Sequence, residues 1–436
     1  MSDTRPLQDE TIFALSSAPG RAGVSVLRLS GASAGRALQD LTGRALPMPR
    51  AATLRAIRDG VGDIIDKPLL LWFPAPKSFT GEDCAEIHVH GSVAILESVA
   101  ARLTELGLRQ ARPGEFTRRA VEHGKMDLTE AEGLADLIDA RTEGQRVQAL
   151  SNMGGALREI YEGWQSLILD ALAQIEGEID FADEADVPDA LSHAAYPFLT
   201  KAYDGMQAAL AEAGRGRAVR DGLQVAIIGV PNAGKSTLLN ALVGRDVAIT
   251  SPQAGTTRDV VEAGAVIAGL PVTFSDTAGL RESEDVIEAE GVRRARARAE
   301  DAHLVVHVVR GNAPPRLAAD MVFENLESGS PDRSGHYIKG NALAGEGVDL
   351  LWAEIERQIL AKFAGLENAA LTRIRHVECI SSACQSVDAS REKLGSEPEL
   401  ASEDLRKALK SIEELAGRSD MEQVFDRIFS SFCIGK

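Results

Sequence analysis

The sequence is short of cysteine and of positive charge. Its 436 residues include four cysteines, and 47 Lys+Arg face 65 Asp+Glu, so the formal net charge is −18. Four scattered cysteines without a C-x-x-C pair exclude a disulfide framework and predict reduced thiols. The negative charge excludes a protein that coats nucleic acid through bulk charge, so any such contact needs a local patch or a partner's surface.

Long hydrophobic runs are also missing. No stretch approaches the roughly 18 consecutive apolar residues of a membrane helix, and residues 1–6 hold no apolar signal core. We therefore expect a cytosolic protein without a membrane span. No internal repeat or low-complexity tract occurs, and at roughly 150 residues per domain the length favours about three domains.

The hydrophobic pattern divides the chain into three regions, which predicts a multidomain α/β protein. Residues 1–122 alternate apolar β-like runs (24–29, 69–73, 85–89) with helical spacing at 92–106, which is typical of an α+β domain. Residues 216–370 alternate strand candidates (224–228, 272–275, 304–309) with helices, which predicts an inserted, Ras-like doubly wound sheet.

Two amphipathic helical sets flank this insertion. Proline is avoided from Leu128 to Ile179, where steps of three and four predict one long helix with a buried stripe made of Leu150, Met153, Leu157, Ile160, Trp164, Leu167 and Ala171. The same steps recur at Leu405, Ala408, Ile412 and Leu415, and an apolar face at Val424, Phe425, Ile428, Phe429 and Phe432. Because each set needs a partner, we expect one discontinuous helical bundle domain, 123–215 plus 371–436. Between the periodic segments, the acidic run 180–189 and Arg215, Arg217 and Arg220 are expected to be solvated connections.

The strongest motif is a phosphate-binding loop. Residues 229–236, Gly-Val-Pro-Asn-Ala-Gly-Lys-Ser, follow the strand 225–228 and precede a helix at 237–243, as a P-loop requires. Backbone N–H groups then meet the phosphates, Lys235 reaches the β and γ groups, and Ser236 binds Mg²⁺. Asp276-Thr277-Ala278-Gly279 ends the strand 272–275, which predicts a carboxylate for the Mg²⁺ shell and a backbone that senses the γ-phosphate. Between these motifs, Gly255-Thr256-Thr257-Arg258-Asp259 supplies hydroxyl groups.

This order of motifs resembles the TRAFAC class of GTP-binding proteins. Leu280 stands where Ras-like switches carry a water-positioning glutamine, so another group must supply transition-state charge. In relatives that use potassium for this purpose, an asparagine in the P-loop helps to bind the ion, and Asn232 stands at that place. Two readings of Asn232, a potassium ligand and a turn residue, stay open.

The whole chain resembles the MnmE (TrmE) family of tRNA-modifying GTPases. The resemblance is carried by the GTPase motifs and by five further segments, 18–31, 78–83 (Ser-Phe-Thr-Gly-Glu-Asp), 112–117 (Arg-Pro-Gly-Glu-Phe-Thr), 124–128 (Gly-Lys-Met-Asp-Leu) and 433–436 (Cys-Ile-Gly-Lys). It implies a first domain that binds 5,10-methylene- or 5-formyl-tetrahydrofolate and forms a homodimer. The folate contacts implied by the resemblance are Arg28, Glu86, Lys125 and Lys436; a carboxylate suits a pterin edge, and cations suit a glutamate tail.

The resemblance also implies the residues of the nucleotide site. GTP is held by Asn232, Ala233, Gly234, Lys235, Ser236, Thr237, Ser251, Gln253, Thr256, Thr257, Asp276, Thr277, Ala278 and Gly279. Within this set, Mg²⁺ falls to Ser236 and Thr257, and K⁺ to Asn232, Ser251, Gln253 and Thr256. The water-orienting glutamate falls on Glu288, although Glu282, Glu284, Asp285 and Glu290 crowd the same loop.

The activity implied is a joint one. With the flavin- and NADH-dependent partner MnmG (GidA), the family adds an aminomethyl or carboxymethylaminomethyl group to C5 of the wobble uridine in certain tRNAs, and the folate donates the methylene carbon. The net charge fits tRNA held mainly by the partner. The run Arg293, Arg294, Arg296 and Arg298 is a local basic patch or, as is more usual on a helix, a solvated face. Cys433 is either a nucleophile near the methylene donor or a small buried hydrophobe beside Phe429 and Phe432.

Other polar residues are candidate metal ligands. Cys84, His88 and His90 lack a fourth ligand, which disfavours a zinc site. His303 and His307 lie in or beside an apolar strand and are expected in the core.

One motif departs from the family. Where guanine is read by Asn-Lys-x-Asp, the chain has Asn325-Leu326-Glu327-Ser328, and Gly340-Asn341-Ala342-Leu343 replaces the Ser-Ala loop. Loss of a bidentate aspartate costs about 1.5 to 3 kcal/mol, so we expect weaker guanine selectivity with hydrolysis retained.

Two alternative functions remain. One is a GTPase switch in assembly on ribosomal RNA, and the other is a folate-binding scaffold with a degenerate G domain.

Overall fold

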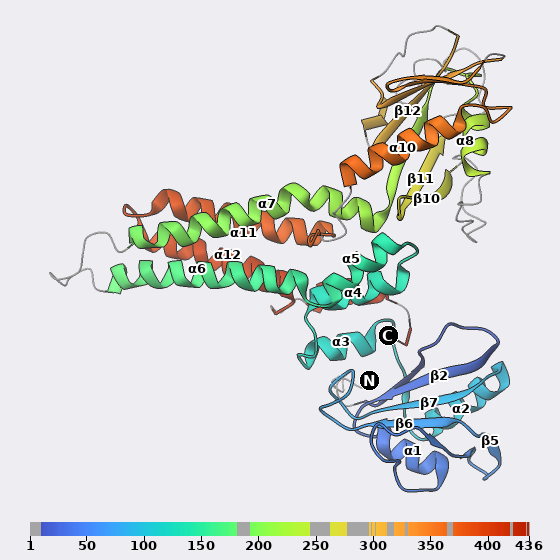
Figure 1. Cartoon of the computed structure of the whole chain (residues 1–436). Coiled ribbons are helices and arrows are strands. Elements are labelled where there is room, and N and C mark those ends of the chain that lie inside the picture. The colour runs from blue at the N-terminus through green and yellow to red at the C-terminus, as the bar shows by residue number, and fades with distance from the viewer. Residues whose placement is uncertain are drawn as a thin grey trace, which may run out of the picture. The chain divides into compact units, whose positions relative to one another are not determined.

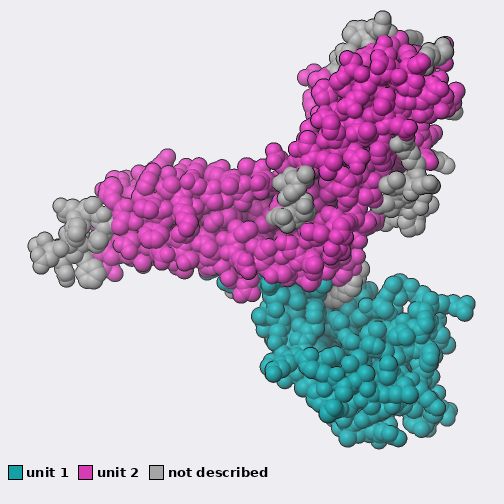
Figure 2. Space-filling view, viewed as in Figure 1, with its two compact units in different colours: residues 1–135, 413–436 teal, residues 136–412 magenta. Residues whose placement is uncertain are grey.

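The computed structural model describes most of the chain as two compact units. Unit 1 comprises residues 1–135 and 413–436, and unit 2 comprises residues 136–412; Figure 2 colours them separately. The described residues are 10–180, 192–244, 262–276, 296–297, 299–300, 302–311, 318–327, 330–363, 369–418, 422–432 and 434–435. The division into three domains at 122, 215 and 370 stays a prediction.

Unit 1 is built on a six-stranded sheet in the order β3-β6-β7-β2-β1-β8. Its strands are β1 (Ile12–Leu15), β2 (Ala22–Ser30), β3 (Thr53–Leu54), β6 (Leu69–Phe73), β7 (Cys84–Gly91) and β8 (Arg109–Gln110), and β4 (Ile57–Arg58) pairs separately with β5 (Ile64–Asp66). Two helices, α1 (Ala34–Thr42) and α2 (Val93–Glu105), contribute buried side chains to the core of one face, together with Leu27, Leu29 and Ile87. The predicted strands and the helix after Ser92, whose side chain caps α2, are confirmed.

The alternation along each strand places other side chains on the opposite face. Ile12 and Ala14 of β1 pack there with Phe116 of α3 (Glu115–Glu122). Beyond them, α13 (Glu422–Ser430) contributes Phe429, which packs with Phe432 against Leu128. The apolar face predicted near residue 428 therefore has its partner in the helix that begins at Leu128.

Unit 2 contains a seven-stranded, mainly parallel sheet, as predicted. Its order is β10-β11-β9-β12-β13-β15-β14, and β11, β9, β12, β13 and β15 run parallel, with an antiparallel strand at each edge. The strands are β9 (Leu223–Ile228), β10 (Glu262–Ile267), β11 (Leu270–Asp276), β12 (Leu304–Arg310), β13 (Met321–Asn325), β14 (Asp332–Ser334) and β15 (Tyr337–Gly340). Two helices, α8 (Lys235–Val243) and α10 (Val348–Phe363), pack on its core (Figure 1).

The remaining helices of unit 2 lie alongside one another (Figure 1). They are α5 (Glu143–Met153), α6 (Ala156–Asp180), α7 (Tyr196–Asp221), α11 (Ile374–Lys393) and most of α12 (Pro398–Ala416), and a short 3-10 turn, η2 (Ser192–Ala195), precedes α7. α7 packs against both α6 and α11, and Arg406 of α12 bonds Glu176 of α6 at 2.6 Å. Leu405, Ala408, Ile412 and Leu415 are buried, as predicted.

The prediction of one long helix from Leu128 was wrong. The segment forms α4 (Leu128–Asp139), α5 and α6, because Thr142 caps a new helix at Gln145 N–H (3.3 Å) and the pair Gly154–Gly155 interrupts the next one. The buried face of these helices therefore differs from the predicted stripe. Leu157, Trp164 and Ala171 are buried, but Leu150 and Ile160 are 44% and 39% exposed, and Tyr161, Ile168 and Ile175 complete the buried face of α6.

Helices long and apolar enough to cross a membrane do not occur in the described part of the chain.

Candidate functional site

The phosphate loop lies where parallel sheets of this kind bind ligands, at the carboxyl end of a central strand. β9 ends at Ile228 and α8 begins at Lys235, with the glycine loop between them. Gly234 has φ +97°, and a Cβ there would lie 2.1 Å from Nδ2 of Asn325, so only glycine fits. Asn232 is exposed and also has positive φ (+62°), a conformation that asparagine tolerates in turns.

Lys235 is buried at the mouth of the loop. Its side chain is turned onto the loop itself, and Nζ donates to the carbonyls of Gly229 (3.0 Å) and Val230 (3.1 Å). Burial lowers the pKa of this ammonium, and the charge of Asp276 offsets part of that effect. No carboxylate within the described residues is ion-paired with it. The ammonium is thus available to an anion that displaces the two carbonyls.

A hydroxyl and a carboxylate meet next to this lysine. Ser236 Oγ donates to Oδ2 of Asp276 at 2.5 Å, and Asp276, the last residue of β11, is only 1% exposed. Oxygen donors of this kind are the ligands that Mg²⁺ prefers, directly or through water. The residues present therefore fit a magnesium ion beside the phosphates.

At the other end of the site, Asn325 links the phosphate loop to the loop that follows β15. Its Nδ2 donates to the carbonyl of Ala233 (3.0 Å), and its Oδ1 accepts from the N–H of Ala342 (3.1 Å). Leu326 follows in place of a lysine, and Glu327 forms an ion pair with Arg310. Asn341 Oδ1 accepts from the N–H groups of residues 343 and 344, so it shapes its own turn.

Many predicted residues of the nucleotide site lie outside the described residues. They are Ser251, Gln253, Thr256, Thr257, Thr277, Ala278, Gly279 and Glu288, together with Leu280 and Ser328. The structure brings together Lys235 and Ser236 from the start of α8, Asp276 from the end of β11 and Asn325 from the end of β13. Ala233 is buried and Thr237 is half-buried in the first turn of α8. Of the arginine run, Arg296 is described; it is mostly exposed and pairs with Glu300 at 3.1 Å.

A second site lies on the sheet of unit 1. Arg28 on β2 and Glu86 on β7 are directly paired across the strands, and Nη2 of Arg28 lies 3.1 Å from Oε1 of Glu86. The Arg28 guanidinium also stacks over Phe79 (5.0 Å to the ring centroid). Both charged residues line a cavity of about 400 Å³, which is large enough to hold part of a folate-sized molecule. The structure thus brings two of the four predicted folate residues together.

The other two predicted residues are placed less closely. Lys125 is exposed, and its Cε lies 3.0 Å from where a Cβ on Gly81 would stand. Lys436 and Cys433 lie outside the described residues, but their neighbours are anchored in unit 1. Ile434 bridges to Pro113, and Ser16 Oγ donates to the Gly435 carbonyl at 2.8 Å.

The histidines and cysteine weighed as metal ligands have other partners. His88 lies 3.1 Å from Glu86, and His90 lies 2.8 Å from Asp66. Cys84 Sγ is 3.1 Å from the Thr80 hydroxyl. In the core of unit 2, His307 is 4% exposed, and His303 Nδ1 accepts from the N–H of Gln224 at 3.0 Å. Burial lowers the pKa of His303.

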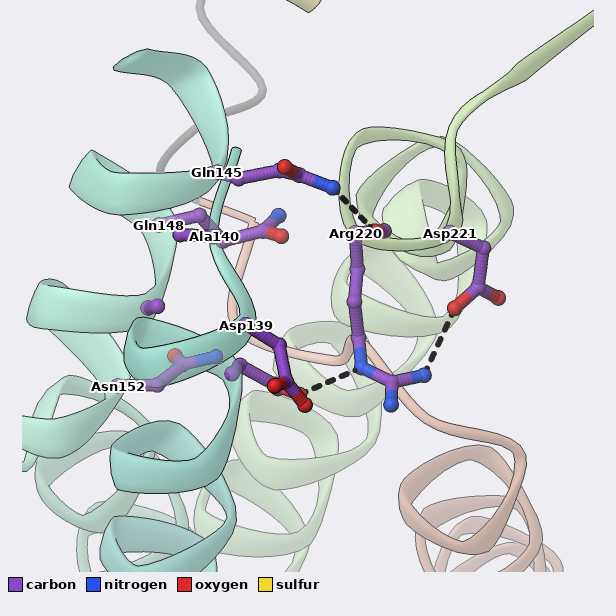
Figure 3. Close-up of a pocket in the computed structure, with 9 residues that line it drawn as sticks. Asp139, Ala140, Gln145, Gln148, Asn152, Arg220 and Asp221 are labelled. Atoms are coloured by element: carbon purple, nitrogen blue, oxygen red, sulfur yellow. Dashed lines mark hydrogen bonds and ion pairs between the residues drawn. The ribbon is translucent and has the colours of Figure 1, made fainter. Parts of the chain in front are cut away.

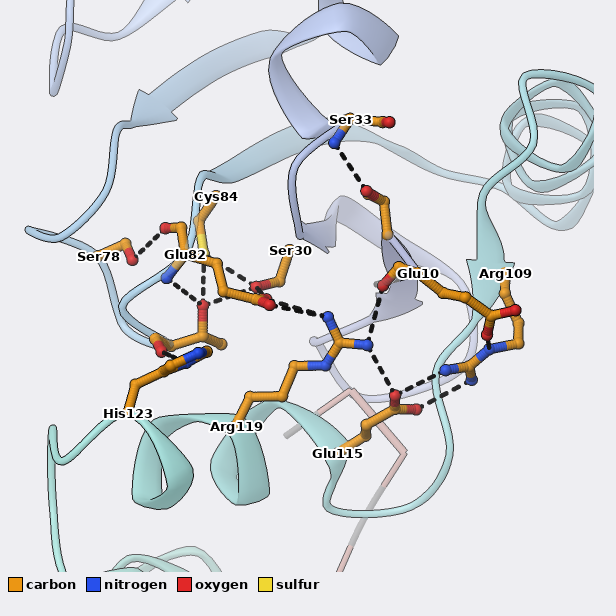
Figure 4. A network of polar contacts seen from close by, with 12 residues as sticks. Glu10, Ser30, Ser33, Ser78, Glu82, Cys84, Arg109, Glu115, Arg119 and His123 are labelled. Atoms are coloured by element: carbon orange, nitrogen blue, oxygen red, sulfur yellow. Dashed lines mark hydrogen bonds and ion pairs between the residues drawn. The ribbon is translucent and has the colours of Figure 1, made fainter. Parts of the chain in front are cut away.

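Sequence reasoning missed a buried polar network behind the folate candidate. Arg119, 3% exposed, donates to Glu82 (3.0 Å) and Glu115 (3.0 Å), and Glu82 accepts from Ser30 Oγ (2.6 Å; Figure 4). Burial raises the pKa of Glu115, but the hydrogen bonds from Arg109 and the Arg112 N–H outweigh it, and the net pKa is lowered. The motifs 78–83 and 112–117 are therefore held together by charge-assisted bonds. The signal available in sequence was their density of charged residues beside Gly and Pro.

A third polar feature corrects one prediction. The prediction of a solvated connection at Arg215, Arg217 and Arg220 was wrong, because all three lie on α7. Arg220, on its last turn, bonds Asp136 at 2.9 Å and lines a cavity of about 110 Å³ with Gln145, whose side chain donates to the Arg220 carbonyl (Figure 3). Asp136 also accepts from Arg373 at 2.6 Å. The reason is geometric, because α7 continues six residues past Arg215 and turns this side chain toward α4. Most of the acidic run 180–189 lies outside the described residues.

The fold of unit 2 and its loop define a P-loop nucleotide-binding protein. A family model described as "MnmE helical domain" matches residues 128–433, and one described as "GTP-binding protein TrmE N-terminus" matches residues 11–125. The chain belongs to the MnmE (TrmE) family of tRNA modification GTPases.

Similar proteins match along almost the whole chain. A protein of Maricaulis maris named "tRNA modification GTPase MnmE" is 51% identical over 436 residues, which are 98% of this chain and 99% of the relative. Proteins of the same name from Paramagnetospirillum magneticum and Caulobacter vibrioides are 48% and 46% identical, and each alignment covers 98% of this chain and 100% of the relative.

Proposed function

We propose that this protein hydrolyses GTP and couples the hydrolysis to modification of C5 of the wobble uridine in certain tRNAs. Similarity to MnmE proteins over 98% of the chain supports the proposal. The structural observation that carries it is the buried Lys235 beside the Ser236–Asp276 pair at the end of the glycine loop. Phosphoryl transfer depends mainly on positioning and on charge stabilisation, and these groups provide both.

In the proposed nucleotide site, each residue has a defined task. Lys235 leaves the carbonyls of residues 229 and 230 and binds the β- and γ-phosphates. Ser236 and Thr257 hold Mg²⁺, and Asp276 orients that shell. Asn232, with Ser251, Gln253 and Thr256, holds K⁺. When bound, the potassium ion supplies positive charge where an arginine finger acts in other GTPases. Glu288 orients the attacking water, which Leu280 is unable to do.

The proposed folate site is the cavity beside Arg28 and Glu86. Glu86 faces the donor edge of the pterin ring of 5,10-methylene- or 5-formyl-tetrahydrofolate, and Arg28 holds this carboxylate in place. Lys125 and Lys436 add positive charge. Cys433, one residue before the anchored Ile434, is proposed as a nucleophile toward the one-carbon unit.

The proposed assembly is a homodimer formed through residues 1–122, with the helical domain (123–215 plus 371–436) and the G domain (216–370) attached. MnmG (GidA) supplies the flavin chemistry and holds most of the tRNA, which suits a partner with a net charge of −18. The site of action is proposed to be cytoplasmic.

Two measurements test the function. Wild-type protein should release phosphate from GTP much faster in KCl than in NaCl at equal ionic strength, and Asn232→Ala should remove most of that difference while Asn240→Ala, an exposed residue of α8, should not. Cells lacking the gene should lose the aminomethyl-type wobble uridines when tRNA nucleosides are analysed by mass spectrometry. Normal wobble uridines in the deletion strain would refute the tRNA-modifying role.

A folate-binding scaffold with a degenerate G domain is the second candidate, because residues 325–328 depart from the guanine-reading motif. It requires that nucleotide binding be absent. Intact tRNA nucleosides together with defective ribosomal subunits would instead favour the assembly switch.

A further inference from the structure

Two cations stand on the rim of the unit 1 cavity without an assigned task. Arg50 and Lys77 line it together with Arg28, Glu86 and the rings of Phe73 and Phe79. Both cations are exposed, and neither forms an ion pair with a carboxylate within the described part of the chain. In a protein of net charge −18, two adjacent unpaired cations on a concave surface are suited to an anionic ligand.

The position of Arg50 is fixed by several contacts. Its N–H donates to the carbonyl of Trp72 (2.8 Å), its guanidinium lies over the ring of Phe73 (5.7 Å to the centroid), and one Nη donates to the carbonyl of Lys77. The backbone at Arg50 is left-handed (φ +62°), which is uncommon for a residue other than glycine. Such strain is characteristic of ligand-binding positions. The guanidinium is therefore held over the cavity, and the bond to Lys77 leaves most of its donors for a ligand.

The two ends of the cavity differ in charge. At one end, Glu86 offers a carboxylate paired with Arg28; at the other, Arg50 and Lys77 are cationic. Phe73 on β6 pairs with Cys84 on β7, and Cys84 is two residues before Glu86 on the same strand. Strand spacings therefore separate Phe73 from Glu86 by roughly 8 Å. Phe79 lies under Arg28 at the first end and Phe73 lies under Arg50 at the second, so both rings line the cavity with aromatic surface. The cavity thus offers a carboxylate, aromatic rings and two cations. These groups match a ligand with a hydrogen-bonding ring, an aryl linker and an anionic tail.

We infer that Arg50 and Lys77 bind the glutamate carboxylates of the folate tail and that the site is selective for folates that carry several γ-linked glutamates. The inference rests on the proposed folate function, which it extends from the ring to the tail. Each added glutamate brings one more negative charge to a rim that is partly open to solvent. The gain from such exposed contacts is modest for each pair and declines with salt.

Calorimetry with three ligands tests this inference. 5-Formyl-tetrahydrofolate with three glutamates should bind the full-length protein on the order of tenfold more tightly than the monoglutamate at low ionic strength, and 5-formyl-tetrahydropteroate, which has no glutamate, should bind most weakly. The triglutamate advantage should shrink as KCl is added. Equal affinity of the monoglutamate and triglutamate would overturn the inference.

Variants identify the residues. Arg50→Gln and Lys77→Gln should each reduce the triglutamate advantage and leave pteroate binding unchanged, whereas the control Arg36→Gln, an exposed arginine on α1, should change neither. Lys77→Gln serves if Arg50→Gln unfolds, because Lys77 is exposed and its side chain forms no hydrogen bond or ion pair within the described residues. A triglutamate advantage that both variants retain would also overturn the inference.

The outcomes separate the two proposals. If no folate binds at all, the folate function itself fails. If the monoglutamate binds but the tail makes no difference, only the inference fails. If the two variants lose tRNA affinity while the triglutamate advantage persists, the rim serves RNA phosphates and the inference is wrong. Free tri-γ-glutamate, added as a competitor, should displace little ligand, because the tail acts only when joined to the ring.

Discussion

The two ends of the nucleotide site in unit 2 differ in how much of their chemistry is kept. At the phosphate end, Ser236 bonds Asp276, and Lys235 donates to the carbonyls of the phosphate loop. At the base end, Asn325 keeps its structural bonds to both neighbouring loops, yet Leu326 brings no charge. The residue that joins the loops is thus present, whereas leucine stands where the family's lysine is expected.

From this difference we predict that hydrolysis and base choice are separable in this fold. Phosphates are bound by backbone N–H groups, a lysine and a metal shell, none of which touches the base. Base identity depends on a few side chains at the other end, and their loss leaves the phosphate chemistry in place. Four variants test this difference between the phosphate end and the base end.

The largest effect is expected at the phosphate end. Lys235→Ala should lower kcat/KM for GTP by on the order of 10²–10³, because a charge that stabilises the transferred phosphoryl group is removed. Phosphate release measures it, and Asn240→Ala on the same helix should match wild type. A loss below about tenfold would show that Lys235 does not contact the phosphates.

The start of β15, at the edge of the sheet opposite Asn325, should be stabilised by a buried carboxylate except at low pH. Glu354, fully buried on α10, accepts hydrogen bonds from Arg357 (2.6 Å) and Gln358 (3.1 Å) and pairs with His336 on the turn before β15. These bonds, chiefly that from Arg357, lower the pKa of Glu354 to about 2.

Because this pKa lies below the unfolded value, the stabilisation is complete above pH 4.5 and is lost as pH falls toward 2. Glu354→Gln should therefore cost on the order of 2 to 3 kcal/mol at pH 7. The difference from wild type should narrow steadily below pH 4.5 in urea unfolding. Glu356→Gln is the control on the same helix, and a pH-independent difference would contradict the assignment.

Asp276→Asn tests the metal shell. It keeps a hydrogen-bond acceptor for Ser236 but removes the charge, so GTP affinity measured with Mg²⁺ should fall roughly 10- to 100-fold. Affinity measured in EDTA should change little. Equal losses under both conditions would mean that the aspartate acts on folding of the loop instead.

The smallest expected effect is a gain in selectivity for guanine. Wild type should bind GTP and ITP with similar affinity, because ITP lacks only the 2-amino group that an aspartate reads. Leu326→Lys combined with Ser328→Asp should favour GTP over ITP by more than tenfold. Fluorescent nucleotide competition measures both ratios. Strong GTP preference in wild type would show that another group already reads the base.

Much of the fold was predictable from local pattern. The strand before Gly229, the glycine loop and the strand that ends at Asp276 form one motif, and motif spacing alone placed Lys235, Ser236 and Asp276 together. The apolar steps at Leu405 to Leu415 also predicted a buried face correctly, since no cap or glycine interrupts them.

Features that depend on distant contacts were not predictable. The pattern around Leu150 continues across Gly154 as if the helix did, so the break between α5 and α6 was missed. Arg220 looked solvated because its partner, Asp136, lies 84 residues away in the chain. Arg50 carries no motif at all, and its position at the cavity emerges only when β6 and the loop before β3 place the guanidinium over Phe73.

The anchoring of residues 434–435 has a consequence for biosynthesis. A Cβ on Gly435 would lie 2.0 Å from the Leu15 carbonyl oxygen, and one on Gly114 would lie 2.7 Å from that of Phe429, so early and late segments of unit 1 fit with no spare room. Ribosomes make residues 136–412 between these segments, which at ordinary elongation rates takes on the order of tens of seconds. During that interval the nascent first segment lacks α13, so the aliphatic side chains that pack against this helix, among them Val121, Leu128 and Ala131, stay uncovered until residues 422–432 are made.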